Sequence, residues 1–245
     1  MTEVALTRGE VTLRGTVAGA GPTVLLLHAG GEQRGVWTPI AAVLSRRGLR
    51  TVAFDLRGHG ASSGRAMTLG AIADDVTVMI RDQPAPVVVV GASLGGLAAI
   101  ASLADVRTAR QVAGLILVDV VPDPDPARVR AWLAERGLRH DRAELVEDIL
   151  ERGPDLLATA MTIELPILLV RGGPRSPLTG AEVDRFRAAG RAVTVARVPS
   201  AGHLIAHDAP DELARIIADQ ASTWLTPDHL GVPAGHLGSS SRRRA

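Results

Sequence analysis

The chain has 245 residues, a formal net charge of +1 and no cysteine, and 46% of its residues are hydrophobic against 22% charged. This balance is typical of one soluble globular domain. The near-zero net charge gives no reason to expect binding to nucleic acid or to an anionic membrane. Without cysteine, disulfides, thiolate metal sites and a cysteine nucleophile are excluded. All 27 basic residues are arginine, which hints at a GC-rich bacterial genome.

The first residues carry no basic segment followed by an apolar run, so no signal peptide is expected. Apolar runs such as residues 87–90 are too short to span a bilayer. Lack of cysteine is compatible with a reducing compartment, and we expect a cytoplasmic protein. The oligomeric state is left open.

Short apolar runs alternate along the chain with longer amphipathic stretches. Nearly continuous runs indicate strands buried on both faces, as in a parallel sheet covered by helices. Such runs cover residues 23–27, 51–54, 87–90, 115–118 and 167–170, and more alternating strands are expected over 11–17 and 192–198. Helices are expected over 36–47, 69–82, 94–104, 181–189 and 211–224. This alternation predicts βαβ units, with ligands bound at the carboxyl ends of the strands.

Residues 121–163 interrupt this alternation with a Pro/Asp-rich start and helical stretches around Trp132, Leu145 and Leu156. A helical insertion at this place would cover the strand ends as a cap. We expect one domain over residues 1–226. Residues 227–245 have little to bury and are expected to form a disordered tail.

The segment VVVVGASLGGLAAI contains G-x-S-x-G between a buried strand and a helix. A serine on such a cramped turn exposes its hydroxyl beside a helix N-terminus, so Ser93 is the expected nucleophile. The two flanking glycines, Gly91 and Gly95, remove side chains that would clash there. The alternative is a glycine-rich turn that only packs a helix on the sheet.

The segment TVLLLHAGG places two glycines after the first buried run. Acyl transfer needs N–H donors aimed at the developing oxyanion, and glycine-rich loops supply them. We assign the backbone N–H groups of Gly30 and Leu94 to this oxyanion hole, with Gly31 as the alternative to Gly30. His28 is expected to hold the loop rather than to act as a base.

The segment VPSAGHLIAHDAPDEL carries the expected general base, His203, on a loop after the last strand. A histidine at that strand end can reach the nucleophile, and its position after the serine fits the chain order serine, acid, histidine. His207 is the competing candidate. No histidine–carboxylate spacing resembles a metal site, and no cofactor is expected.

Taken in order, LLLHAGG, VAFDLRGHGASS, VVGASLGGLAA, LILVDVVP, ILLVRGG and the histidine segment resemble the α/β-hydrolase superfamily. The similarity is to its branch of small bacterial esterases and cofactor-free haloperoxidases, and it covers about residues 11–224. It implies an α/β-hydrolase fold with an eight-stranded, mostly parallel sheet flanked by helices. It also implies a short helical cap after the sixth strand.

The resemblance departs from the family at the triad acid. Members usually carry it after the strand 167–170, where this chain has Pro177. Asp119, one strand earlier, is the nearest replacement, and some haloalkane dehalogenases take their acid from that place. Asp123, Asp125 or a serine–histidine dyad remain alternatives, whereas Glu182 and Asp184 are expected on a helix surface. The choice matters because losing the orienting carboxylate lowers the rate roughly 10⁴-fold.

The expected function is cleavage of a small carboxylic ester through an acyl-enzyme, because a serine cannot replace the aspartate used in alkyl displacement. Perhydrolysis or C–C hydrolysis would use the same residues. Trp37, Leu94 and Val121 lie beside the motif loops and are candidates to line the substrate pocket, with core packing as the alternative. The only expected partner is a small-molecule substrate. A non-catalytic hydrolase fold that binds a small apolar ligand is the second hypothesis.

Overall fold

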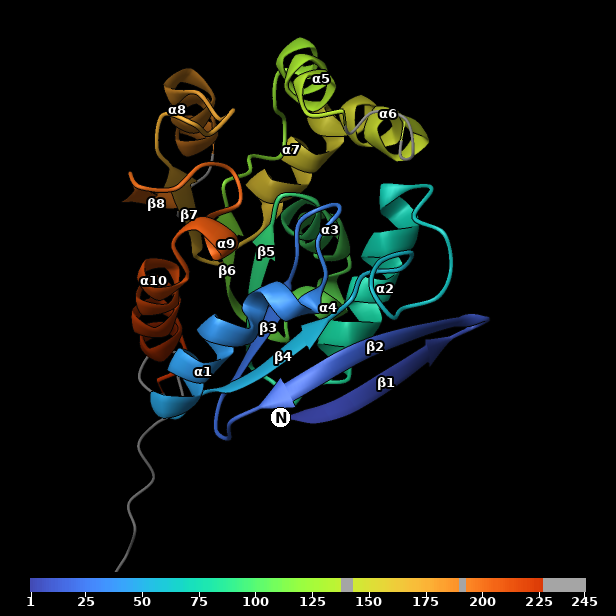
Figure 1. Cartoon of the computed structure of the whole chain (residues 1–245), viewed down its shortest axis with the longest axis vertical. Coiled ribbons are helices and arrows are strands. Elements are labelled where there is room, and N and C mark those ends of the chain that lie inside the picture. Colours follow the sequence, from blue (N-terminus) through green and yellow to red (C-terminus); the bar gives the residue numbers. More distant parts are fainter. Residues whose placement is uncertain (138–142, 190–192, 227–245) are drawn as a thin grey trace, which may run out of the picture.

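An eight-stranded sheet forms the centre of the computed structural model, which describes residues 1–137, 143–189 and 193–226 (Figure 1). The strands are β1 (Thr2–Arg8), β2 (Val11–Ala18), β3 (Thr23–Leu27), β4 (Arg50–Phe54), β5 (Val87–Ala92), β6 (Val112–Val118), β7 (Ile167–Gly172) and β8 (Val193–Val198). Their order across the sheet is β1-β2-β4-β3-β5-β6-β7-β8. β2 runs antiparallel to β1 and β4, and the other neighbours are parallel. The predicted mostly parallel α/β fold is therefore confirmed.

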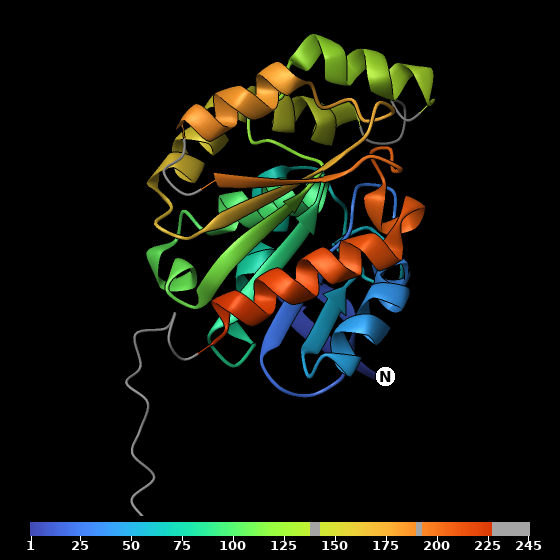
Figure 2. The ribbon, with the colours of Figure 1, turned by 90° about the vertical axis from the view of Figure 1, so that its left-hand side faces the viewer.

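Helices cover both faces of the sheet (Figure 2). One face carries η1 (Arg34–Trp37), α1 (Thr38–Arg46), α9 (Ile205–Asp208) and α10 (Pro210–Trp224). The other carries α2 (Leu69–Arg81), α3 (Leu94–Ser102), α4 (Val106–Ala109) and α8 (Gly180–Ala189). Within the described residues, no helix combines the length and the apolar character needed to cross a membrane.

Successive residues of the inner strands enter two different cores. In β3, Leu25 and Leu27 pack with α2 and α3, whereas Val24 and Leu26 pack with α1 and α10. All four side chains are fully buried. This burial on both faces explains why the inner strands consist of continuous apolar runs in the sequence.

Strand β1 is the one strand that lies outside the predicted segments. It forms an antiparallel hairpin with β2 through Gly9, whose φ of +58° suits glycine, and Glu10. None of its residues is buried, since exposed and half-buried positions alternate along it. An edge strand of this kind lacks the apolar run from which the inner strands were predicted.

The predicted insertion contains α5 (Pro126–Glu135), α6 (Ala143–Glu151) and α7 (Gly153–Thr162), which follow β6 and precede β7. They lie beyond the carboxyl ends of the parallel strands (Figure 1). Leu145 and Leu156 join the core shared with α2 and α3, but no residue of α5 is buried. Arg130 of α5 is paired with Glu147 of α6 at 2.6 Å. The predicted tail, residues 227–245, lies outside the described residues.

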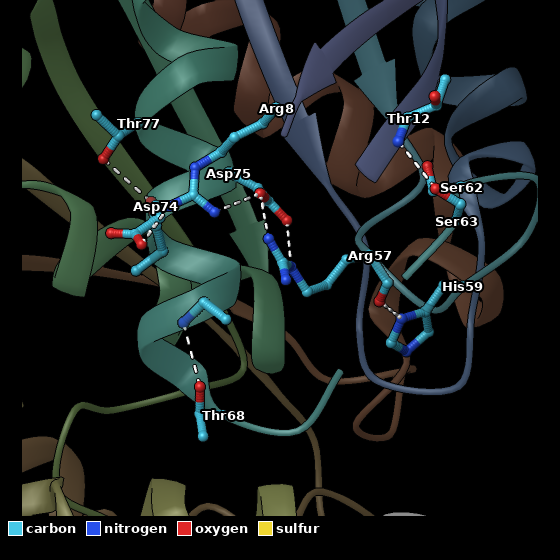
Figure 3. Close-up of polar contacts among 12 residues, drawn as sticks. Arg8, Thr12, Arg57, His59, Ser62, Ser63, Thr68, Asp74, Asp75 and Thr77 are labelled. Atoms are coloured by element: carbon cyan, nitrogen blue, oxygen red, sulfur yellow. Dashed lines mark hydrogen bonds and ion pairs between the residues drawn. The ribbon is translucent and has the colours of Figure 1, made fainter. Parts of the chain in front are cut away.

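A buried ion pair anchors the loop that follows β4 (Figure 3). The carboxylate of Asp75, on α2, is fully buried and accepts hydrogen bonds from Arg57 Nε at 2.5 Å and Nη2 at 2.6 Å. Arg8 of β1 contacts the same carboxylate at 3.4 Å and the exposed carboxylate of Asp74 at 2.5 Å. The pair thus joins α2, the edge hairpin and the loop that contains His59. The ring of His59 lies 5.0 Å from the ring of His28.

Replacing Asp75 by alanine is expected to lower the free energy of unfolding by about 3–5 kcal/mol, because Arg57 would keep a largely buried charge without its partner. Urea unfolding followed by circular dichroism measures this. Asp74→Ala is the matched control: its side chain is 61% exposed, and a change below about 1 kcal/mol is expected. Equal losses in the two variants would contradict the assignment.

Candidate active site

Ser93 lies on a sharp turn between β5 and α3. Its backbone, with φ 45° and ψ −113°, adopts a conformation that residues with a side chain seldom take. A Cβ on Gly91 would lie 2.5 Å from Gly96 Cα, and one on Gly95 would lie 2.6 Å from the carbonyl oxygen of Leu27. Glycine is therefore required on both sides of the serine. The half-buried Ser93 side chain lines a cavity at the carboxyl ends of the strands.

Asp119, at the end of β6, and His203, in the loop after β8, are in direct contact. His203 Nδ1 lies 2.9 Å from Asp119 Oδ2, and the carboxylate is fully buried. It also accepts hydrogen bonds from the N–H of Gly172 at 2.7 Å and from Ser176 Oγ at 2.6 Å. These three contacts fix the position of the carboxylate. Because Nδ1 faces Asp119, Nε2 is the imidazole nitrogen left for the cavity.

The loop after β7 contributes a hydroxyl rather than an acid. Pro177, at the position where the resemblance leads one to expect the acid, lines the cavity. Its neighbour Ser176 supports Asp119 instead, and the sequence analysis missed this residue. In the sequence, Ser176 is marked only by its place next to Pro177. That place does not show which group its hydroxyl binds.

The other acidic candidates have other contacts. Asp125 caps α5 by accepting the N–H of Arg128 at 2.8 Å, and neither Asp125 nor Asp123 is hydrogen-bonded to His203 in the described part of the chain. Glu182 was expected on the surface, and this is wrong, because its carboxylate is buried and accepts the N–H groups of Asp125 and Thr179. Burial alone would raise the pKa of Glu182, but these hydrogen bonds outweigh it and lower the pKa below its ordinary value.

The glycine loop after β3 lies against the N-terminus of α3. A Cβ built on Gly30 would be 3.6 Å from Leu94 Cδ2, and both residues line the cavity. Among the described residues, none accepts a hydrogen bond from the N–H of Gly30 or Leu94. The same holds for Gly31, which also lines the cavity. Gly30 and Leu94 stay our proposed donors, with Gly31 as the alternative.

Two further histidines differ sharply in their surroundings. His28 is fully buried; its Nε2 accepts the N–H of Leu56 at 3.0 Å, and its Nδ1 lies 2.8 Å from the carbonyl oxygen of Ala29. It therefore ties the glycine loop to the start of the loop after β4. His207, the competing base, is 77% exposed and faces Asp208 at 3.6 Å. No group of three His, Cys, Asp or Glu side chains in the described chain could hold a metal ion.

Glu32 closes the turn that contains Gly30. Its carboxylate accepts the N–H of Ala29 at 3.2 Å, and its own N–H donates to the carbonyl oxygen of Ala29 at 3.1 Å. Burial raises the pKa of the Glu32 carboxyl above its ordinary value. The Ala29 N–H and the nearby His203 and His207 offset this only in part. Ionisation of Glu32 is therefore less favourable in the folded protein than in the unfolded chain.

A cavity of about 660 Å³ joins these groups. Ser93, Asp119 and His203 all line it, although no hydrogen bond joins Ser93 Oγ to His203 within the described structure. Such contacts are often long in ligand-free enzymes and tighten when substrate binds. Most of the remaining wall is apolar and comes from the core and the cap, including Leu94, Leu97, Val121, Val129, Leu133 and Leu178.

Trp37 does not line this cavity, contrary to the expectation from sequence. Its side chain is fully buried and packs in the core formed by α1, α10 and the sheet. Trp132 of α5 takes a place on the cavity wall instead, with its ring centroid 4.8 Å from that of His203. The sequence marked Trp132 only as part of a helix.

Known proteins are similar to this chain in sequence and in fold. The alpha/beta hydrolase family profile matches residues 24–216, and the chain belongs to this family. Protein phosphatase methylesterase 1 of Bos taurus is 37% identical over 128 residues, which is 49% of this chain and 33% of that protein. The chain thus spans about a third of the methylesterase.

Two further similarities extend over most of the chain. An uncharacterized protein of Mycobacterium tuberculosis is 27% identical over 223 residues, covering 86% of this chain and 72% of that one. The crystal structure of a thermophilic esterase from Thermogutta terrifontis superimposes with a TM-score of 0.75 at 23% identity. That match covers 92% of this chain and 100% of the esterase, and it shows the shared fold.

Glu32→Gln is expected to raise the melting temperature at pH 7, because glutamine keeps an acceptor for the Ala29 N–H without a buried charge. A raised carboxyl pKa costs the folded state stability above that pKa. The gain should therefore shrink as the pH falls through the folded-state pKa and vanish below the ordinary value of 4.5. Thermal melts of both proteins from pH 4 to 8 measure this, with the exposed Glu10→Gln as control. A gain that does not depend on pH would refute the assignment.

Proposed function

We propose that the protein is a serine hydrolase that cleaves the carboxylic ester of a small, largely apolar substrate. Ser93 is the nucleophile, His203 the general base and Asp119 the carboxylate that orients His203. The observation that carries this proposal is the 2.9 Å contact between Asp119 and His203 beside the cavity that Ser93 lines. The similarity to a methylesterase and the shared fold of an esterase support ester chemistry.

Each residue has a defined part in the proposed reaction. Ser93 Oγ attacks the acyl carbon while His203 Nε2 takes its proton, and the N–H groups of Gly30 and Leu94 donate to the oxyanion. The tetrahedral intermediate then expels the alcohol, which takes the proton from His203. Water attacks the acyl-enzyme with His203 again as base, and the carboxylic acid leaves as Ser93 regains its proton.

The second hypothesis, a hydrolase fold that binds a ligand without turnover, drew its support from the missing acid after β7. The contact of Asp119 with His203 removes that support, because a buried carboxylate does reach the imidazole. The mostly apolar cavity suits the chain of a small ester. Perhydrolysis and C–C hydrolysis would use the same residues, and we prefer ester cleavage because of the named relatives.

A fluorophosphonate probe is expected to label the wild-type protein, because the probe reacts with activated serines and Ser93 is the proposed nucleophile. Gel fluorescence measures the labelling. Ser93→Ala should abolish it, while Ser222→Ala, which removes an exposed serine of α10, should leave it unchanged. A well-folded wild type that takes no label would favour the ligand-binding hypothesis.

Asp119→Asn is expected to lower kcat for a 4-nitrophenyl ester by about 10³- to 10⁴-fold, because the imidazole loses the carboxylate that sets its tautomer. Steady-state release of 4-nitrophenol measures this, with circular dichroism to confirm folding. Asp123→Asn, at the other nearby candidate acid, should stay within a few-fold of wild type. If the Asp119 variant instead keeps near-normal turnover, Asp119 is not the triad acid.

A further inference from the structure

The cavity wall carries charged groups besides Asp119 and His203. Arg128, Arg136, Arg175, Glu182 and Asp208 also line it. Arg128 Nε lies 4.0 Å from Glu182 Oε2, and Arg175 Nη2 lies 3.6 Å from Asp208 Oδ2. Two of these three arginines therefore face a carboxylate of the same wall, which compensates their charge.

Arg136 has no such partner on the wall in the described residues. Its carboxylate contact there is Glu135, the preceding residue, at 3.8 Å. The Glu135 side chain is 74% exposed and does not line the cavity, and exposed pairs of this kind contribute little. Arg136, whose side chain is 43% exposed, thus brings to the cavity a positive charge that no carboxylate of the described wall faces.

Trp132 determines where this charge lies. Arg136 directly follows α5, and its guanidinium carbon is 4.2 Å from the centroid of the indole ring. Its Nη1 also donates a hydrogen bond to the carbonyl oxygen of Trp132 at 3.4 Å. Such a cation–π contact restrains a side chain that would otherwise extend into solvent. His203 packs against the same indole with ring centroids 4.8 Å apart and an interplanar angle of 70°. Arg136 and His203 therefore contact the same indole.

The indole also has a donor in need of an acceptor. Trp132 Nε1 is buried, and none of the described residues accepts its hydrogen bond. A water-sized group in the cavity does not reach this nitrogen. The indole therefore contributes to the wall through its ring, which holds the Arg136 guanidinium beside the cavity.

We propose that Arg136, positioned by the ring of Trp132, binds a carboxylate at the end of the substrate remote from the scissile bond. The substrate class is then an ester with a free carboxylate, such as a half-ester of a short dicarboxylic acid. The planar guanidinium matches the two carboxylate oxygens, and the apolar wall takes the intervening chain. This inference rests on the proposed function, since it assumes that the ester lies at Ser93.

The test compares two esters of equal chain length, 4-nitrophenyl hydrogen adipate and 4-nitrophenyl hexanoate, after correction for spontaneous hydrolysis. Wild type should favour the adipate in kcat/KM. Arg136→Gln should lower the adipate-to-hexanoate ratio at least about 10-fold, as expected for losing a hydrogen bond to a charged group. Trp132→Leu, which removes the ring that holds the guanidinium, should lower it too. Arg46→Gln, at an exposed arginine of α1, should leave the ratio unchanged.

The possible failures are distinguishable. If wild type cleaves both esters and the ratio does not depend on Arg136, the carboxylate site is refuted while the proposed function stands. If wild type cleaves neither ester, the proposed function fails, and calorimetric titration of Ser93→Ala with monomethyl adipate tests the carboxylate site separately. There, adding Arg136→Gln should weaken the Kd at least about 10-fold. Equal affinities, or no binding at all, would overturn the inference.

Discussion

The hydrogen bond between Asp119 and His203 is the contact on which the candidate site depends. It joins residues that are 84 positions apart, one at the end of β6 and one in the loop after β8. Parallel strands end at the same edge of the sheet, and β7 lies between these two, so the fold alone brings the residues together. β7 also supplies the Gly172 N–H that holds the carboxylate, and the imidazole turns its Nδ1 toward that carboxylate.

The sequence predicts those parts of the structure that leave a local pattern. The inner strands consist of apolar runs because both faces are covered. The turn at Ser93 follows from G-x-S-x-G because Gly91 and Gly95 touch neighbouring backbone, where no side chain fits. Strand β1 is not predicted, because its residues are at most half-buried and an edge strand has no continuous apolar run.

Contacts between distant segments cannot be predicted from a local sequence pattern. Asp119, Asp123 and Asp125 lie within a few residues of each other, and only the folded chain separates the partner of His203 from a helix cap. Glu182 has the sequence context of an exposed helix residue, yet its carboxylate accepts a hydrogen bond from the backbone N–H of Asp125, in another segment. Trp132 shows the same limit, because the packing of the cap decides which side chain of α5 meets the imidazole.

The carboxylate that contacts His203 belongs to Asp119, at the end of β6. This position affects the role of the loop after β7. In this chain the charged group stands at the end of a strand paired on both sides, where the backbone has little freedom. The loop after β7 does not supply this acid, and its Pro177 forms part of the cavity wall. The carboxylate that contacts His203 and this part of the cavity wall thus lie on separate segments. A substitution at position 177 can therefore reshape the cavity without changing either partner of the contact between Asp119 and His203.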